Sequence, residues 1–408
     1  MHSPTREVVD SARAVEPEDK APAGFQTSSV MTIIAGHAVH DMYTAFLPPL
    51  LPLFIAGFSL SVTQAGALSL FLLLPPTIQP IIGRVADRKN LRPLVIISPM
   101  VAGVTMSLLG AAPSYAALAI LLTVAGLNTA GLHAVAPAMT GRLSGQHLGR
   151  GMGLWMVGGE LGRAVGPLLI VGAVGLFTLQ GTYWLIPIGV LSSAILLFRL
   201  RNVNDAPPDR RSEVAWGPAL RRMAPVMLPL TGVLLVRALV QAALTSYLPT
   251  FLTMEGEELW FAGASLSVLE AAGVAGAMLG GVLSDRLGRR RVLAASALST
   301  PALLLVFLRA DGWSRVPVLV LLGLSLLSIT PVIMALVQES FPEHRALANG
   351  MYMAASFATA SVGVVIVGVM SDLMGMRPAF VASALIMLLA VPILALLPGR
   401  GVQALDLV

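Results

Sequence analysis

Three ionisable residues stand close together in an apolar stretch near the start of the chain. The stretch HAVHDMYTAFLPPLLPLF begins with His37 and also contains His40 and Asp41, whose spacing of three and four residues places them on one face of a helix. Ionisable groups at bilayer depth are costly and usually face the protein interior or a water-filled pathway. Histidine titrates near neutrality, so this cluster has the groups that proton transfer requires.

More ionisable residues lie in apolar stretches farther along the chain. Glu160 and Arg163 share a helix face and form either a self-neutralising ion pair or part of a transport site. Asp41 either exchanges protons or forms a fixed salt bridge with Arg237. The candidate proton-coupling residues are Asp41, His37, His40, Glu160 and Glu270. The candidate substrate-binding residues are His133, Arg163, Arg237, Gln241, Asn128, Tyr43 and Tyr247. His133 by itself is more typical of a hydrogen-bonded packing residue.

The composition indicates a polytopic membrane protein. Hydrophobic residues make up 56% of the 408, charged residues 12%, and the mean hydropathy is +0.82, whereas a soluble domain has roughly 25% charged residues. No cysteine is present, so the sequence has no disulfide framework and no thiolate metal site. The first residues are acidic and rich in Pro and Ala, which predicts a polar, disordered tail rather than a signal peptide.

The apolar stretches predict twelve membrane-spanning helices in an all-α integral membrane fold. The expected spans are 28–57, 63–83, 92–111, 115–140, 150–177, 181–200, 222–254, 260–283, 290–308, 315–340, 346–370 and 377–397. The widest break divides them into two halves of six. The expected organisation is a tail at 1–27, an N-terminal half at 28–200, a linker at 201–221, a C-terminal half at 222–398 and a tail at 399–408.

The basic residues predict that both termini are cytoplasmic. If they are, 21 of the 26 Lys and Arg lie in cytoplasmic segments and only Arg309, Arg315 and Arg377 lie in outer loops. Such a bias is the usual signal of membrane orientation. The sequence pI of about 10.1 then reflects topology and requires no nucleic-acid partner.

A motif recurs at corresponding places in the two halves. GRVADRKNLRP and GVLSDRLGRRR both contain Gly-x-x-x-Asp-Arg followed by basic residues. Two six-helix halves related in this way resemble the parallel repeat of the major facilitator superfamily. We expect glycine to allow close packing, and the Asp-Arg pair to bridge helix ends as a cytoplasmic latch. The latch residues are Gly83, Asp87, Arg88, Gly281, Asp285, Arg286 and Arg290.

Two copies of this motif depart from the pattern. Asn90 and Leu91 stand where the second copy has Gly288 and Arg289, which predicts a weaker latch in the first half. A partial copy, GVMSDLMGM, begins at Gly368 but lacks the arginines. The predicted topology places it at the outer face, where we expect no latching contact.

A stripe of small residues marks the fifth predicted span. Gly158, Gly162 and Gly166 recur at four-residue spacing, with Pro167 directly after them, and this stripe lets another helix approach closely. The stripe resembles the antiporter motif of proton-coupled exporters, although such stripes also occur as plain packing surfaces. The prolines of LPP at 47 and YLP at 247 break the first and seventh spans at corresponding positions. Such paired breaks indicate the substrate site and a moving gate.

Several segments together resemble the fosmidomycin-resistance family within the major facilitator superfamily. They are GHAVHDMYTAFLPPLLPLF, LHAVAPA, GRGMGLWMVGGELGRAVGPLL, TSYLPTFLTMEG, GGVLSDRLGRRRVL and PVIMALVQESFPEHRALANGM. The resemblance covers about residues 28–395 and implies a proton-driven efflux pump of the inner membrane. In the fourth span His133 matches the family, whereas Ala134 stands where the family often has proline.

These observations favour a proton-coupled antiporter that exports a small drug-like or anionic metabolite. An uptake symporter or anion exchanger on the same fold is the alternative, and a non-transporting receptor or scaffold is more remote. We expect no enzyme, cofactor or metal site, because the sequence shows no phosphate loop, nucleophile constellation or metal-ligand set. The expected partners are a small-molecule substrate, protons and the lipid bilayer, with the chain as a monomer.

Overall fold

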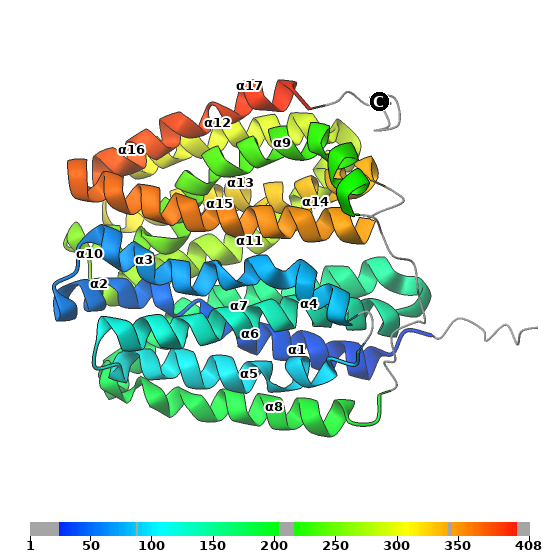
Figure 1. Ribbon diagram of the computed structural model, residues 1–408. Coiled ribbons are helices and arrows are strands. Elements are labelled where there is room, and N and C mark those ends of the chain that lie inside the picture. The colour runs from blue at the N-terminus through cyan, green and yellow to red at the C-terminus, as the bar shows by residue number, and fades with distance from the viewer. Residues whose placement is uncertain (1–23, 87–88, 204–215, 342–344, 398–408) are drawn as a thin grey trace, which may run out of the picture.

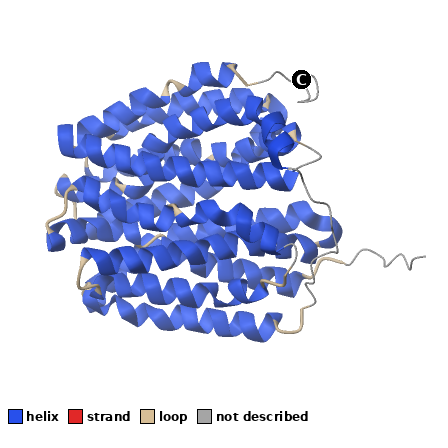
Figure 2. Cartoon of the chain, viewed as in Figure 1, coloured by secondary structure: helices blue, strands red, loops and turns tan. Residues whose placement is uncertain are grey.

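The structure of the chain is a computed structural model that describes residues 24–86, 89–203, 216–341 and 345–397 (Figure 1). Within these residues every regular element is a helix (Figure 2). The predicted C-terminal tail, most of the predicted N-terminal tail and more than half of the predicted linker lie outside the described residues.

Seventeen α-helices run through the described part of the chain. In the N-terminal half they are α1 (Thr27–Thr44), α2 (Leu47–Phe58), α3 (Val62–Leu73), α4 (Gln79–Ala86), α5 (Arg92–Ser107), α6 (Tyr115–Leu143), α7 (Leu148–Phe177) and α8 (Ile186–Leu200). In the C-terminal half they are α9 (Trp216–Gln241), α10 (Leu248–Met254), α11 (Leu259–Leu287), α12 (Arg289–Phe307), α13 (Arg315–Leu327), α14 (Ile329–Ser340), α15 (Arg345–Met374), α16 (Met376–Met387) and α17 (Ala390–Ala395).

These helices form twelve candidate membrane spans among the described residues, which confirms the predicted number. Several spans contain two helices, because prolines interrupt them. The first span breaks between α1 and α2 ahead of Pro48, and the seventh contains a π-helical segment, Ala242–Ser246, ahead of Pro249. Proline removes a helical hydrogen bond, so both predicted breaks have their expected cause.

The two halves lie one above the other in Figure 1, with α1–α8 below and α9–α17 above. They meet where α7 contacts α11, where α3 contacts α15 and where α2 contacts α10. Helix α1 begins at the right of the view and α3 begins at the left, so successive spans run in opposite directions. The C-terminal half packs around one apolar core, and the N-terminal half has two clusters of its own.

The small-residue stripe of α7 packs against α1. A Cβ at Gly158 would lie 2.7 Å from a methyl of Ile34, one at Gly162 would lie 2.2 Å from the carbonyl oxygen of Ala38, and one at Gly166 would lie 2.3 Å from that of Met42. Real Cβ atoms do not come this close to backbone atoms. Glycine is therefore required for the contact that brings α7 against the ionisable face of α1.

A single methyl group in this contact should destabilise the fold. We expect Gly162→Ala to lower the melting temperature and the yield of detergent-extracted, monodisperse protein, since overpacking costs about 1–3 kcal/mol. Gly172→Ala is the matched control, because a Cβ there meets no atom within 4 Å and alanine favours a helix. Equal melting temperatures for the two variants would show that the α1–α7 contact tolerates the methyl.

Candidate functional site

A cavity of about 1870 Å³ lies between the two halves. Its lining extends from Asp41 and Ser69 deep in the bundle to Arg84, Asn90 and Leu148, which lie where α4 ends and α7 begins. We call this the open end of the bundle and the opposite end, where α3 begins and α15 ends, the closed end. Ligand pockets usually measure roughly 300–1,000 Å³, so the cavity has room for a small substrate and water.

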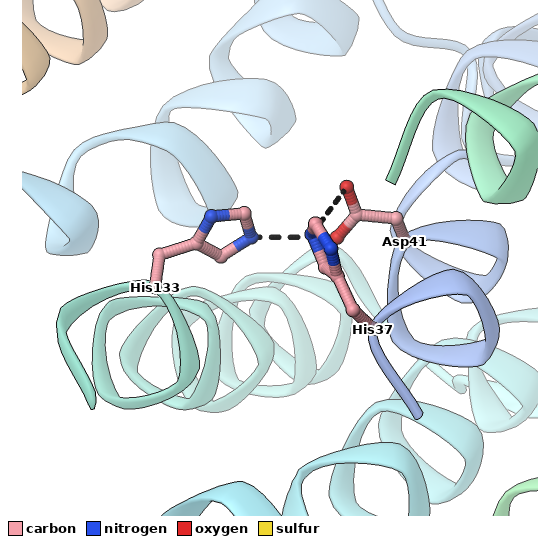
Figure 3. Close-up of side chains that lie close together, drawn as sticks. All are labelled: His37, Asp41 and His133. Carbon is pink, nitrogen blue, oxygen red and sulfur yellow. Dashed lines mark hydrogen bonds and ion pairs between the residues drawn. The ribbon is translucent and has the colours of Figure 1, made fainter. Parts of the chain in front are cut away.

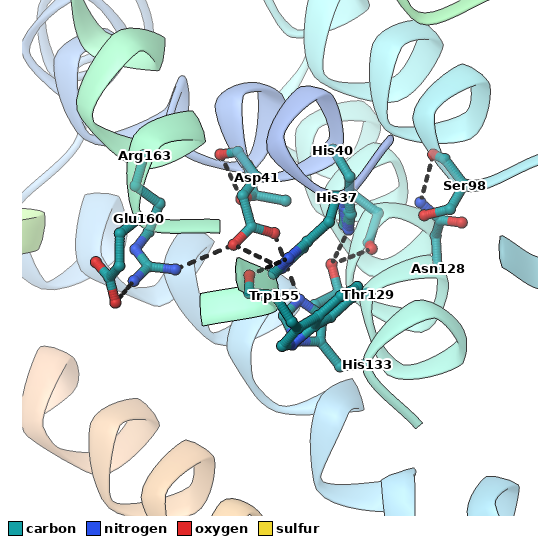
Figure 4. Close-up of polar contacts among 12 residues, drawn as sticks. His37, His40, Asp41, Ser98, Asn128, Thr129, His133, Trp155, Glu160 and Arg163 are labelled. Atoms are coloured by element: carbon teal, nitrogen blue, oxygen red, sulfur yellow. Dashed lines mark hydrogen bonds and ion pairs between the residues drawn. The ribbon is translucent and has the colours of Figure 1, made fainter. Parts of the chain in front are cut away.

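Asp41 of α1 lies at the centre of a polar cluster in the cavity wall (Figure 4). Its carboxylate oxygen Oδ2 lies 3.0 Å from Arg163 Nη1 and 3.3 Å from His37 Nε2, and its Oδ1 lies 3.4 Å from His133 Nε2. The partners come from α1, α6 and α7. We call Asp41, His37, His133 and Arg163 the Asp41 cluster.

His37 is held in one orientation by Trp155 of α7. The two rings stack with centroids 3.6 Å apart and an interplanar angle of 7°, and His37 Nδ1 lies 3.1 Å from the carbonyl oxygen of Trp155. A carbonyl only accepts, so Nδ1 carries the proton of that bond. In the neutral ring Nε2 is then an acceptor that faces the carboxylate of Asp41, which is also an acceptor. The contact becomes a hydrogen bond only when an additional proton binds to His37 or to Asp41.

Arg163 connects three carboxylates. Besides Asp41, its guanidinium pairs with Glu160 one turn earlier on α7, and Nε lies 3.7 Å from Glu270 Oε2 on α11. The alternative in which Glu160 and Arg163 only neutralise each other is therefore incomplete. Arg163 also joins α1 to α7 and the N-terminal half to the C-terminal half. With neutral histidines, three carboxylates and one guanidinium leave a formal charge of −2.

His37, Asp41 and His133 also have the geometry of a candidate metal site (Figure 3). One ligand atom from each lies within 4.8 Å of the others, and the bond from His37 Nδ1 to a carbonyl is the kind that orients metal-ligating histidines. The sequence analysis identified no such set, because His133 is far from the other two in the chain. Arg163 Nη1 lies 3.0 Å from Asp41 Oδ2, and its charge opposes a divalent cation at this position.

Arg237 lies on the C-terminal side of the cavity. Its guanidinium donates to Gln241 Oε1 at 2.6 Å, to the carbonyl oxygen of Leu326 at 3.2 Å and to Thr330 Oγ1 at 3.4 Å. Among the described residues no carboxylate forms an ion pair with Arg237, and its Nε has no hydrogen-bond partner. The expected alternative of an Asp41–Arg237 salt bridge is wrong in this structure, because Asp41 pairs with Arg163 instead.

Four candidate site residues do not line the cavity. Tyr43 donates to the carbonyl oxygen of Leu185 and accepts from the backbone N–H of Gly189, so it joins α1 to the sixth span. Tyr247 is fully buried toward the closed end and donates to a carbonyl oxygen of α15. Asn128 donates to the carbonyl oxygen of Ser98, and His40 Nε2 contacts Thr129 Oγ1 (Figure 4). These four residues were expected in the site, and the structure places them outside the cavity lining.

The other candidates line the cavity, including His133, Gln241 and Glu270. His133 was a candidate substrate-binding residue with packing as the alternative, and its contact with Asp41 places it in the cluster. Trp155 and Thr129 also line the wall and were missed. Their roles depend on contacts between helices, and no spacing in the sequence indicates these contacts.

The predicted latch is formed differently in the second half. Asp285 pairs with Arg289 at 2.6 Å, and Arg289 pairs with Glu339 of α14 at 2.7 Å, so the contact joins three helices of the C-terminal half. Arg286 and Arg290 were predicted, whereas the structure uses Arg289. A Cβ at Gly83 or Gly281 would meet no atom within 4 Å, so close packing does not explain these glycines. Asp87 and Arg88 lie outside the described residues.

Comparison with known proteins places this chain among transporters. A family model described as Major Facilitator Superfamily matches residues 33–341 and 261–404. The chain is 26% identical over 373 residues to the uncharacterized MFS-type transporter YfnC of Bacillus subtilis (strain 168), a match that covers 87% of this chain and 89% of the relative. It is 24% identical over 382 residues to the fosmidomycin resistance protein of Escherichia coli (strain K12), covering 88% and 92%.

A solved structure shows the same fold. It is a bacterial homolog to the human lysosomal transporter Spinster in an inward-facing and unoccupied conformation, similar with a TM-score of 0.75 and 15% sequence identity. The similarity covers 92% of this chain and 97% of that chain. The similarity therefore extends over most of the chain.

Removal of Arg163 should leave three carboxylates without their shared cation. We expect Arg163→Met to lower the free energy of unfolding at neutral pH, by less than the roughly 3–5 kcal/mol usual for a fully buried pair, because Asp41 is buried but the Arg163 side chain is 36% exposed. Acidification from about pH 8 to about pH 5 should raise the variant's melting temperature, because protonation removes the uncompensated charge. Arg163→Lys, which keeps the charge, is the control. A melting temperature equal to wild type at every pH would contradict this role.

Proposed function

Because this chain belongs to the major facilitator superfamily, we propose that it is a proton-coupled secondary transporter. In this proposal it is an antiporter that exports a small anionic or drug-like molecule across the inner membrane by alternating access. The observation that carries the proposal is the contact between His37 Nε2 and Asp41 Oδ2, two acceptors 3.3 Å apart in a cavity wall. A proton bound to either residue turns that contact into a hydrogen bond, so the site can hold a proton.

The Asp41 cluster is proposed as the proton site. His37 and His133 each present a ring nitrogen to the same carboxylate, and an imidazole nitrogen can bind or release a proton. The formal charge of −2 on the three carboxylates and Arg163 is balanced when two protons bind. Protons from the cavity then change the charge of the site without any other ion.

Arg237 is proposed as the receptor for an anionic substrate group. Arg163 is occupied by three carboxylates, so its charge is already compensated. Arg237 faces the same cavity, and among the described residues all of its hydrogen-bond partners are neutral. The two parallel N–H groups of an arginine match the oxygens of a carboxylate or a phosphonate. Gln241 lies beside it and orients the guanidinium.

The link between proton and substrate is proposed to pass through Arg163. Arg163 lies on α7 and pairs with Glu270 on α11, so this contact connects the two halves that must move in alternating access. A proton on Glu270 weakens the contact between the halves and allows them to separate, and a proton on Asp41 weakens the hold on Arg163 within the N-terminal half. Substrate at Arg237 and protons at Asp41 thus act on the same movement.

The orientation of the cycle follows from the charge bias. With the termini cytoplasmic, as the basic residues predict, the open end faces the cytoplasm and the cavity is ready to load substrate for export. In the same proposal the two halves that move against each other are residues 28–200 and 222–398. The named function of the fosmidomycin resistance protein supports export, and so does the packed stripe of α7. Uptake by a symporter or exchange of anions is the alternative on this fold.

The proton site is tested by transport with Asp41→Asn. Proteoliposomes that contain a pH-sensitive dye are screened with phosphonates, carboxylates, organic cations and sugars, and the class that triggers proton flux with wild type is used further. We expect Asp41→Asn to retain substrate counterflow but lose gradient-driven export, because asparagine mimics the protonated carboxyl permanently. Asp311→Asn, at an exposed aspartate, is the control. Wild-type gradient-driven export by Asp41→Asn would overturn the proton site.

The anion receptor is tested by binding to Arg237→Gln. We expect the affinity for the anionic substrate class to fall at least about tenfold, since a hydrogen bond to a charged group contributes about 1.5–3 kcal/mol. Arg237→Lys should retain part of the affinity through its charge. Equal dissociation constants for wild type and Arg237→Gln, measured by calorimetry on folded protein, would place the substrate elsewhere.

A further inference from the structure

The partial motif that begins at Gly368 connects the two halves at the closed end. Asp372, near the end of α15, accepts hydrogen bonds from the backbone N–H groups of Val62 at 2.8 Å and Thr63 at 2.9 Å. These residues begin α3, which belongs to the other half. The expectation that this copy makes no latching contact is wrong, because its partner is backbone and no arginine is needed.

The first turn of α3 depends on Asp372 for two of its hydrogen bonds. The first N–H groups of a helix have no partner within the helix. In α3 the N–H of Gln64 donates to the hydroxyl of Ser61, and that of Ala65 donates to the carbonyl oxygen of Ser61. The N–H groups of Val62 and Thr63 are left, and Asp372 accepts from both. A carboxylate here also meets the positive end of the helix dipole.

Close backbone packing accompanies this contact. A Cβ at Gly368 would lie 2.7 Å from the hydroxyl of Tyr247 and 3.0 Å from Thr63 Cα, and one at Gly66 would lie 1.7 Å from the same hydroxyl. The Tyr247 hydroxyl donates to the carbonyl oxygen of Val364 at 2.8 Å. The two glycines therefore leave space for Tyr247 where α3 and α15 cross.

The crossing coincides with the boundary of the cavity. On α15 the lining ends at Val364, and on α3 it includes Ser69 but no residue closer to the helix start. Asp372 lies about two turns beyond this boundary and is exposed. Water can therefore replace its hydrogen bonds when the helices separate, so the contact is reversible.

We propose that Asp372 is the latch of the closed end: its two hydrogen bonds to the start of α3 hold the two halves together while the cavity is accessible from the open end. The motif Gly368-x-x-x-Asp372 has the same spacing as Gly281-x-x-x-Asp285 at the open end. The same motif spacing thus occurs at both ends of the bundle. The aspartate at the open end pairs with a side chain, and the aspartate at the closed end pairs with a helix N-terminus. The inference rests on alternating access but on neither the proton site nor the substrate class.

The test measures separation of the helix ends in purified protein by double electron–electron resonance. The chain has no cysteine, so spin labels on Ala56→Cys and Leu373→Cys report the closed end, and labels on Leu148→Cys and Leu287→Cys report the open end. All four positions are exposed. We expect Asp372→Ala to increase the ratio of long to short distances at the closed end about two- to fivefold, the range given by an anion at a helix N-terminus.

Further variants separate a latch from general damage. Asp372→Asn keeps one acceptor oxygen without the charge and should give an intermediate shift. Gly368→Ala should shift the distances in the same direction by crowding Tyr247. Asp311→Ala is the matched control, because Asp311 lies between α12 and α13 and contacts only residues of its own half among those described.

Two results would overturn the latch. One is an unchanged closed-end distance distribution in both Asp372 variants. The other is the same shift in Asp311→Ala. Because the readout needs neither protons nor substrate, a failure of the latch is distinguishable from a failure of the proposed transport reaction.

Discussion

The half-buried guanidinium of Arg163 is the group on which the site depends. Three carboxylates from α1, α7 and α11 share it, and none of them is stable as an ion in a low-dielectric interior without a cation nearby. Its position is possible only because the glycines of α7 let that helix approach α1 at backbone distance. The packing motif and the ionisable cluster are therefore one arrangement: the glycines place the helix, and the helix places the charge.

The fold was largely predictable from the sequence, because hydropathy and length determine membrane spans directly. The twelve spans, the breaks ahead of Pro48 and Pro249 and the division into halves were all predicted. In lipid a backbone must form helices or closed barrels, so few alternatives remain. Family resemblance added the arrangement of the two halves, which hydropathy alone does not give.

The site was only partly predictable, because its contacts join helices that are distant in the sequence. Asp41 could be identified from its cost in a membrane span, but its partner Arg163 could not, and Arg237 was the expected alternative. Tyr43 and Tyr247 were placed in the site as polar aromatics, whereas backbone carbonyls satisfy both hydroxyls away from the cavity. Asp372 was dismissed because the expected partners were arginines. Sequence patterns show side-chain partners within a helix, but not backbone groups on another helix.

The cavity also has an electrical consequence. Water that fills a space of about 1870 Å³ from the open end has a high dielectric constant, so little of the membrane voltage falls across it. Most of the voltage then falls across the closed end, where α3 and α15 cross. A unit charge that crosses the full potential gains about 2.3 kcal/mol per 100 mV. In this conformation a charged solute that enters the cavity from the open end meets little of the voltage, and the voltage acts mainly on any step that transfers charge past the closed end.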